Sequence, residues 1–403
     1  MNNSYSYVKL KELCDVNQGL QIPIESRFTE NAPNRYFYIT VQFLKASHTN
    51  KFYVENPPSS SICNEEDILI VRTGSTGQIV TGVKGCFHNN FFKVNFNKEL
   101  IHGRYLYHCL NTKEKYRDML RRAGVTTIPD LNHFMFLDME IPVPKKQNQI
   151  EIAKTLDILD SKIELNNRIN AELEAMAKTL YDYWFVQFDF PNKNGKPYKT
   201  SGGKMVWNEE LKREIPEGWE VKKLTEEMDL QYGFPFSTEL FNDDGIGVPV
   251  IRIRDILNCS ISNYSTEEVD DKYRINKGDI IVGMDGNFHI NYWNRDNCYL
   301  NQRSLRIRSN NESISEIQAR YSIEPFVQAR EKNVSRTTVA HLSAKDVNDL
   351  KILKADNEFQ IKANTFFNSN LEKIVSNSIQ NQKLTELRDW LLPMLMNGQV
   401  KVS

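Results

Sequence analysis

The chain has 403 residues, enough for two or three domains, and its 40% hydrophobic and 26% charged residues are ordinary for a globular protein. It contains no apolar run of the ~18 residues that a membrane-spanning helix needs, and it begins without the pattern of a signal peptide, so we expect a cytoplasmic protein with no membrane partner. The formal net charge of −1 does not by itself indicate a nucleic-acid binder, and the six cysteines show no C-x-x-C spacing, which argues against a zinc site and a disulfide framework.

The first part of the chain, residues 1–144, predicts a globular segment of mixed strands and helix. Short runs rich in β-branched and aromatic residues alternate with turn residues, at positions 35–41, 67–72 and 91–96. Residues 103–122 then follow a helical pattern that ends in Arg121-Arg122, where positive charge suits the helix dipole. Arg121 could instead contact a phosphate group of a nucleic acid.

Residues 73–77, with the sequence TGSTG, lie between two strand-like runs. They lack the lysine and the following helix of a phosphate-binding P-loop, so a polar hairpin tip is the plain interpretation. Ser, Thr and Gly at such a tip can also approach a nucleic-acid backbone or base edges, because they are small and form hydrogen bonds.

The motif Asn56-Pro-Pro-Ser59 was compared with the Asn-Pro-Pro-aromatic motif of adenine methyltransferases, whose aromatic ring stacks on a flipped-out base. Here the fourth residue is Ser, and no glycine-rich cofactor loop follows a strand anywhere in the chain. We therefore expect no catalytic residues, no cofactor and no metal ion.

Residues 149–184 organise the chain, because they predict one long helix without Pro or Gly. Apolar residues recur at alternating steps of three and four, which is the heptad seam of a helix that packs against another helix. At about 1.5 Å per residue this helix would span roughly 50 Å. The seam consists of Leu156, Leu159, Ile163, Leu173, Ala177, Leu180 and Trp184, and Asn166 and Asn170 interrupt it.

The same pattern recurs 211 positions later, without a gap, so that Leu173 falls on Leu384 and Leu180 on Leu391. The correspondence extends upstream, where Thr126-Thr127 falls on Thr337-Thr338 and Leu131 on Leu342. The whole chain is therefore an internal duplication, in which each half is a globular segment followed by a long helix. Pro393 and Gly398 predict the end of the second helix.

The two interrupting asparagines are kept in both copies, because Asn166 and Asn170 correspond to Asn377 and Asn381. If the helices pair antiparallel, the copies are related by a pseudo-two-fold axis and these four residues meet close to it. Polar residues in an apolar seam can fix the register of a helix pair, which is our prediction for them; the alternative is a solvated helix face.

The second half repeats the first after a connecting segment, residues 191–215, that is rich in Asn, Lys, Gly and Pro. The strand-like runs of the two halves agree better than their hairpin tips do. The tip of the second half, residues 283–289, differs in length and composition from that of the first half, residues 73–77. We expect this pattern where one scaffold carries two different recognition surfaces.

These features resemble the specificity subunit of type I restriction–modification systems over essentially the whole chain. The helices and the connecting segment carry the specific motifs: Ile141-Pro-Val-Pro144, Leu165-Asn-Asn-Arg-Ile-Asn170, Tyr183-Trp-Phe-Val-Gln-Phe188, Gly195-Lys-Pro-Tyr198, Ser201-Gly-Gly-Lys-Met-Val206, Pro216-Glu-Gly-Trp219 and Leu391-Leu-Pro393. The second copy departs from the Ile-Pro-Val-Pro pattern with Ile352-Leu-Lys-Ala355.

The resemblance implies an α+β fold in which two α/β target-recognition domains alternate with two long helices that pair as an antiparallel coiled coil. The first half would comprise a recognition domain (residues 1–144) and a spacer helix (145–190), followed by a linker (191–215). The second half would comprise a recognition domain (216–355) and a spacer helix with its tail (356–403). The resemblance also implies a non-catalytic subunit whose domains each read one half of a bipartite, asymmetric site in double-stranded DNA. The helices would set the spacing and dock adenine methyltransferase subunits, expected to be two, and a motor-nuclease subunit would be a further partner.

For base reading we single out polar residues at the hairpin tips and in the Thr-Thr segments, because Arg suits guanine, Asn adenine and Thr the thymine methyl group. In the first domain the candidates are Arg72, Thr73, Ser75, Thr76, Arg121, Thr126, Thr127, Asn132 and His133. In the second domain they are Asp285, Asn287, His289, Arg303, Arg336, Thr337, Thr338 and His341. A role in turn structure is the alternative for the Thr-Thr segments, and a structural role is the alternative for His133 and His341.

Two other functions stay open at this point. The first is a self-contained methyltransferase or nuclease, against which the missing cofactor loop argues. The second is a coiled-coil scaffold that joins two modules that do not bind DNA.

Overall fold

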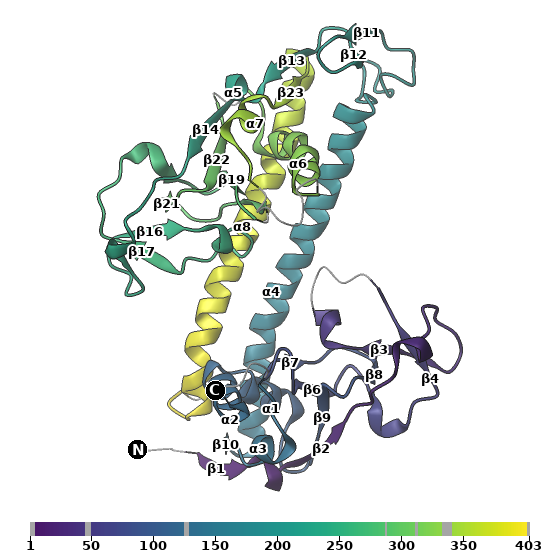
Figure 1. Ribbon diagram of the computed structural model, residues 1–403, viewed down its shortest axis with the longest axis vertical. Helices are drawn as coiled ribbons and strands as arrows, with labels where there is room; N and C mark the ends of the chain where they lie inside the picture. Colours follow the sequence, from purple (N-terminus) through teal and green to yellow (C-terminus); the bar gives the residue numbers. More distant parts are fainter. Residues whose placement is uncertain are drawn as a thin grey trace. The chain divides into compact units, whose positions relative to one another are not determined.

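The computed structural model describes residues 5–44, 50–124, 129–286, 288–310, 313–332 and 341–400 (Figure 1). Its chain forms two compact units. Unit 1 comprises residues 1–162 and 384–403, and unit 2 comprises residues 163–383. In the described part of the chain, every helix is too short or too polar to cross a membrane. The expected fold class is confirmed: two α/β bodies accompany two long helices that pack together.

The α/β body of unit 1 is built on two small sheets. The first has the strand order β2-β9-β6-β7 and is antiparallel throughout, with strands Cys14–Gln18, Phe91–Phe96, Ile68–Val71 and Ile79–Val80. The second has the order β4-β3-β8-β5, with strands Tyr53–Glu55, Arg35–Ile39, Gly85–Phe87 and Ile62–Cys63, and its β3–β8 pair is parallel. A separate antiparallel pair, β1 (Ser6–Lys9) with β10 (Glu140–Val143), joins the two ends of this body.

The helices of this body differ from the sequence prediction in one respect. The expected single helix over residues 103–122 is two helices, α1 (Gly103–Leu110) and α2 (Lys113–Ala123). The break follows from Thr112, whose side chain accepts a hydrogen bond from the backbone N–H of Lys115 and caps α2. A short helix, α3 (His133–Leu137), follows.

The α/β body of unit 2 repeats this plan. The sheet β14-β22-β19-β20 matches the first sheet of unit 1, with strands Met228–Tyr232, Ser304–Ser309, Ile280–Gly283 and Ile290–Tyr292. The sheet β15-β17-β16-β21-β18 has strands Phe241–Asn242, Asn263–Ser265, Val248–Ile251, Cys298–Leu300 and Arg274–Ile275, and its β16–β21 pair is again parallel. The remaining elements of this body are β13 (Glu220–Lys223), β23 (Lys351–Lys354), α5 (Leu224–Glu227), α6 (Glu316–Lys332) and α7 (Ala344–Asn348).

One close backbone contact shows how faithfully the plan is repeated. A Cβ at Gly19 would lie 2.4 Å from the carbonyl oxygen of His88, and one at Gly233 would lie 1.9 Å from that of the equivalent residue, Asn301. In each body only glycine allows these two backbone segments to approach so closely. The residue after each glycine then bonds to the facing strand, Leu20 N to Phe87 O at 3.0 Å and Phe234 N to Leu300 O at 2.7 Å.

The two long helices are α4 (Lys146–Tyr181), which continues as a π-helical turn over Asp182–Val186, and α8 (Asn357–Met396). Of the two residues that predict the end of α8, Pro393 lies inside the helix, which continues to Met396 and ends just before Gly398. A proline in the last turn removes only one helical hydrogen bond, and the neighbouring Leu392, Leu395 and Met396 are buried in the core of unit 1.

Within unit 2, α4 and α8 run antiparallel and lie side by side (Figure 1). Just after the end of α4, the Trp184 ring meets the rings of Phe359, Phe366 and Phe367 of α8 at centroid distances of 5.4 to 5.7 Å. Within unit 1, Leu156 of α4 lies in the same core as the end of α8, and Arg388 Nη1 bonds to Asp160 Oδ1 at 2.9 Å. A polar hairpin, β11 (Met205–Asn208) with β12 (Arg213–Pro216), precedes the second α/β body.

Candidate nucleic-acid interface

The tip after β6 is tied to a distant part of the first body. Arg72 follows the strand, and its Nε and Nη2 donate to Asp130 Oδ1 and Oδ2 at 2.6 and 2.8 Å. The backbone N–H of Leu131 donates to Arg72 O at 3.1 Å, and Thr76 Oγ1 donates to Pro129 O at 2.7 Å. We call these five residues the first joint. It places the hairpin tip beside the segment that leads into α3.

The ion pair of the first joint lies at the surface and not in the core. The side chains of Arg72 and Asp130 are 28% and 44% exposed. Hydrogen bonding to Asp130 raises the pKa of Arg72, and the Arg72 guanidinium holds the pKa of Asp130 below its usual range. Both groups are therefore charged at neutral pH, and both remain accessible to a ligand.

The residues after the first joint begin α3. Asn132 Oδ1 accepts a hydrogen bond from Met135 N at 2.9 Å, so this predicted base reader caps the helix. The His133 ring meets the Phe92 ring edge-on, and its Nε2 is buried without a hydrogen-bond partner among the described residues. Burial lowers the pKa of His133, and the Arg72 cation lowers it further, so the ring is neutral at pH 7. The next side chain, Phe134, is 87% exposed.

The equivalent place in the second body has the same backbone links. Leu342 N donates to Met284 O at 2.9 Å, and Met284 N donates to Arg303 O at 2.9 Å. Asp285 forms a backbone bridge with His341 and faces its side chain, with His341 Nδ1 2.6 Å from Asp285 Oδ1. Arg303 Nη1 lies 3.4 Å from Asp285 Oδ2. We call these five residues the second joint.

The two joints have opposite polarity. Leu131 and Leu342 occupy matching positions of the duplication, and each donates to the carbonyl oxygen just after the central strand. In the first body the cation is on the hairpin tip and the carboxylate precedes the leucine. In the second body the carboxylate, Asp285, is on the tip and His341 precedes the leucine. By strand register Arg72 matches Met284 and Asp285 matches Thr73, so the two tips carry unlike charges at neighbouring positions of the repeat.

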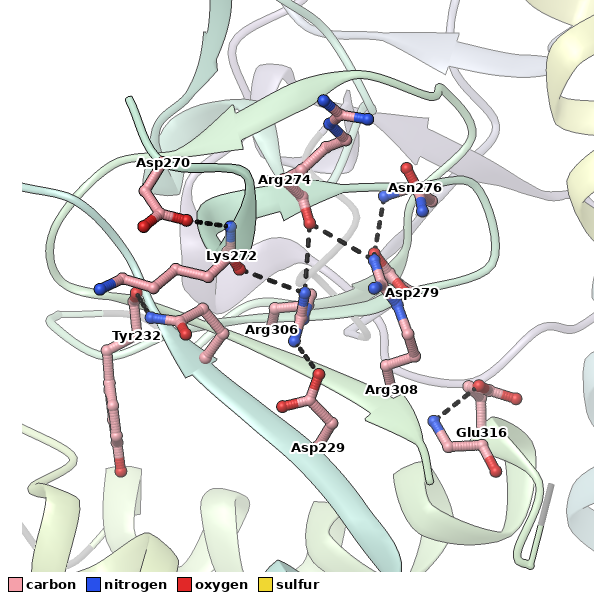
Figure 2. A network of polar contacts seen from close by, with 12 residues as sticks. Asp229, Tyr232, Asp270, Lys272, Arg274, Asn276, Asp279, Arg306, Arg308 and Glu316 are labelled. Carbon is pink, nitrogen blue, oxygen red and sulfur yellow. Dashed lines mark hydrogen bonds and ion pairs between the residues drawn. The ribbon is translucent and has the colours of Figure 1, made fainter. Parts of the chain in front are cut away.

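Other arginines of the second body are structural (Figure 2). Arg306 is buried, bonds to Asp229 and donates to the carbonyl oxygen of Arg274 at 3.2 Å. Arg308 forms two bonds to the buried Asp279, at 2.6 and 2.7 Å. The Arg306 side chain is 4% exposed, and Arg308, although 31% exposed, is engaged by a carboxylate that is 3% exposed, so both hold neighbouring strands together.

The remaining predicted readers have varied surroundings. Thr76 is buried, whereas Thr73 and Ser75 are partly exposed at the tip, and His289 is partly exposed beside Gly283, whose N–H donates to His289 O at 2.8 Å. Arg121 lies exposed at the end of α2, 2.5 Å from Asp118. Thr126, Thr127, Asn287, Arg336, Thr337 and Thr338 lie outside the described residues. A role for any of these residues in base reading stays a prediction.

The four asparagines of the helices meet as two pairs within unit 2. Asn166 Nδ2 donates to Asn381 Oδ1 at 2.8 Å and to Gln380 Oε1 at 2.7 Å. Asn377 Nδ2 donates to Asn170 Oδ1 at 2.8 Å. That these pairs fix the helix register stays a prediction.

Two residues of the first body escaped sequence reasoning. Asp130 had no local signal, because its partner Arg72 is far away in sequence. The duplication offered a clue: it aligns Asp130 with His341, a change of charge beside the shared leucine. Phe134 had no signal, because its exposure depends on how α3 packs. Among the described residues, no group of three or more His, Cys, Asp or Glu side chains could hold a metal ion.

Comparison with known proteins gives a consistent result. The family model described as type I restriction modification DNA specificity domain matches residues 2–175 and 216–354. The MjaIX specificity subunit of Methanocaldococcus jannaschii is 24% identical over 366 residues, covering 83% of this chain and 78% of the relative. The HindI specificity subunit of Haemophilus influenzae is 24% identical over 376 residues, covering 77% of this chain and 80% of the relative.

A solved structure agrees in fold. The crystal structure of the type I restriction–modification S subunit from M. genitalium superposes with a TM-score of 0.58 at 18% identity, covering 98% of this chain and 97% of that one. Because the family model covers both halves of the duplication, the assignment rests on the whole plan of the chain and not on one motif. The chain belongs to the type I restriction–modification specificity family, as a specificity (S) subunit that is itself non-catalytic.

Proposed function

We propose that each α/β body reads one half of a bipartite, asymmetric DNA site, and that the paired helices set the spacing between the halves. A specificity subunit recognises the DNA target of its complex. The observation that supports the finer proposal is the pair of joints: the repeated scaffold carries a cation, Arg72, on one hairpin tip and a carboxylate, Asp285, on the other, one residue further from the strand. Two unlike reading surfaces on one chain suit a split sequence whose halves differ.

The lengths of the helices support a spacer role. Helix α4 has 36 residues and α8 has 40, which correspond to roughly 54 and 60 Å at about 1.5 Å per residue. At ~3.4 Å per base pair, such helices match about sixteen base pairs of duplex. Two readers separated by helices of this length would contact separated half-sites and leave the bases between them unread.

Exposed apolar residues on the helices support docking of two methyltransferase subunits. Ile150 and Ile361 are both exposed and occupy matching positions of the duplication, and so do Met176 and Leu387. A partner that binds the same patch on each copy would bind twice, related by the pseudo-two-fold axis. A motor-nuclease subunit would complete the complex, and partners could supply phosphate contacts that a chain of net charge −1 lacks.

The test is adenine methylation in a host that carries this chain together with its genomic methyltransferase neighbour. We expect a split motif that disappears when the chain is deleted. A hybrid that takes residues 216–355 from a relative of different specificity should change one half of the motif and keep the other. A change in both halves would contradict one reader per half. Unchanged methylation after deletion, together with no duplex binding by the complex, would favour the scaffold function.

A further inference from the structure

The geometry points to Arg72 as a reader of guanine in one half-site and to Asp285 as a reader of the cytosine amino group in the other. Asp130 is then the positioning residue for Arg72, and His341 and Arg303 are the positioning residues for Asp285. This inference rests on the proposed function and deepens it, because it assigns opposite hydrogen-bonding chemistry to the two bodies.

The pair with Asp130 leaves the end of the Arg72 guanidinium open. A guanidinium has five N–H donors, and this pair engages one on Nε and one on Nη2. The Nη1 and Nη2 edge, with three donors, faces away from the carboxylate. Two parallel N–H groups on this edge match O6 and N7 of guanine, which is the commonest specific contact in the major groove.

Asp130 also fixes where this donor edge lies. The bidentate contact at 2.6 and 2.8 Å locks the planar group in one orientation. The Arg72 backbone is held on both sides, since its N–H donates to Asn90 O at 2.6 Å and its carbonyl oxygen accepts from Leu131. A side chain ordered before binding loses less conformational freedom when it contacts a base.

Asp285 presents acceptors on the matching tip, one residue beyond the position that corresponds to Arg72. Its two oxygens offer about four lone-pair sites. His341 approaches Oδ1 at 2.6 Å and Arg303 approaches Oδ2 at 3.4 Å, which leaves further lone pairs on both oxygens. A held carboxylate accepts from the N4 amino group of cytosine, whereas it repels the O6 and N7 acceptors of guanine.

A purely structural role does not account for the reversal. The backbone links that hold each tip are the same in both bodies, so the scaffold does not require a particular charge on the tip. The structural arginine of the second sheet, Arg306, is buried and bonds inward, whereas the charged groups of both joints are partly exposed. Partly exposed groups of opposite sign on the two matching tips, Arg72 on the first residue after its strand and Asp285 on the second, suit two different base readers.

The experiment compares methylation motifs of variants in the complex with the neighbouring methyltransferase. Arg72→Ala and Arg72→Lys should each relax one guanine position of one half-site, with discrimination falling about ten- to a hundredfold, while every other position is kept. Asp285→Asn should relax one cytosine position in the other half-site by a similar factor. Lysine keeps the charge but lacks the paired donors, so its failure to rescue identifies hydrogen-bond reading.

Variants of Asp130 test whether this residue positions Arg72. Asp130→Ala should leave guanine preferred at the same position but with weaker discrimination, and Asp130→Glu should restore part of it. The matched control is Lys9→Ala, which removes the 2.5 Å surface pair with Asp138 in the same body and should leave the motif and its selectivity unchanged. Thermal melting of each complex identifies any variant that fails to fold, and the conservative variants Arg72→Lys and Asp285→Asn then carry the test.

Several results would overturn the inference while the proposed function stands. One is a split wild-type motif whose selectivity is unchanged at every position in folded Arg72→Lys and Asp285→Asn complexes. Another is an equal loss of selectivity at all positions of both half-sites, which would mark the joints as structural. If deletion of the chain leaves methylation unchanged, the proposed function itself fails.

Discussion

Asn166 donates from Nδ2 to Asn381 Oδ1 at 2.8 Å, and the duplication repeats this bond from Asn377 to Asn170 at the same distance. The 211-residue offset matches Asn166 with Asn377 and Asn170 with Asn381, so the second bond repeats the first with the two helices exchanged. A pseudo-two-fold axis between the helices requires this exchange. Asn166 is 1% exposed, so its amide lies among packed side chains and depends on these partners.

We expect a measurable coupling between Asn166 and Asn381. Asn166→Ala should lower the free energy of unfolding by about 1–3 kcal/mol, because it removes the two side-chain hydrogen bonds that the buried Asn166 amide donates, each worth about 0.5–1.5 kcal/mol. In a double-mutant cycle, adding Asn381→Ala should lower it by less than the sum of the single changes. Urea unfolding measures all three variants, and Glu172→Ala, an exposed change on the same helix, serves as the control at about 0.5 kcal/mol or less. Strictly additive losses would show that the pair does not act as a unit.

The packing of α4 in unit 1 predicts a sharp contrast between two nearby residues. Leu156 is fully buried, whereas Ile158 is 59% exposed. Leu156→Ala should lower the free energy of unfolding by about 2–5 kcal/mol, because it removes buried methyl groups and leaves a cavity. Ile158→Ala should change it by about 0.5 kcal/mol or less. Equal losses in urea unfolding would contradict the assigned face of the helix.

Unit 1 should lose stability in mild acid through His108. Its ring is 3% exposed, and its Nε2 lies 2.8 Å from Asp157 Oδ1. Burial lowers the pKa of His108, and the bond to Asp157 opposes this without reversing it. The unfolded chain, with a pKa of about 6.5, therefore takes up the proton first as the pH falls. The stabilising effect is complete above about pH 6.5 and is lost as the pH falls toward the folded-state pKa.

The measurement for His108 is urea unfolding at pH 7.5 and 5.5. One such group changes the free energy of unfolding by at most about 1.4 kcal/mol per pH unit. Burial also lowers the pKa of His88, His102 and His133, so these histidines act in the same direction. His108→Gln should reduce the loss between the two pH values. If the free energy of unfolding fell more in this variant than in the wild type between pH 7.5 and 5.5, neutral His108 would not be stabilising the fold, and the prediction would be wrong.

Phe134 tests the proposal that the surface beside the first joint contacts DNA. Because the ring is 87% exposed, Phe134→Ala should leave thermal melting nearly unchanged. If the ring stacks on or wedges between bases, duplex affinity of the methyltransferase complex should fall by about 1–3 kcal/mol. The matched control is Trp207→Ala, an exposed aromatic change on the hairpin of β11 and β12. Unchanged affinity would exclude a base contact by this ring.

Much of the fold could be predicted because the duplication and the heptad seam repeat over many residues. Local signals were less reliable. Pro393 suggested a helix end, but the burial of Leu395 and Met396 carries α8 past it. Thr112 divides a stretch that reads as one helix, because its hydroxyl caps the second part.

The candidate site was predictable only in part. Arg72 stood out because it flanks a polar tip between strands. Asp130 did not, because only the folded chain brings it to Arg72. The opposite polarity of the two joints depends on the same long-range contacts, so it emerges from the structure and not from either motif alone.

The central claim is that this chain selects a split DNA target, one half with each body. The most direct measurement is sequencing of adenine methylation in a host with and without the chain, alongside its methyltransferase neighbour. We predict a split, asymmetric motif that is methylated only when the chain is present. Methylation that is the same in both hosts, or a continuous motif without an unread spacer, would contradict the account.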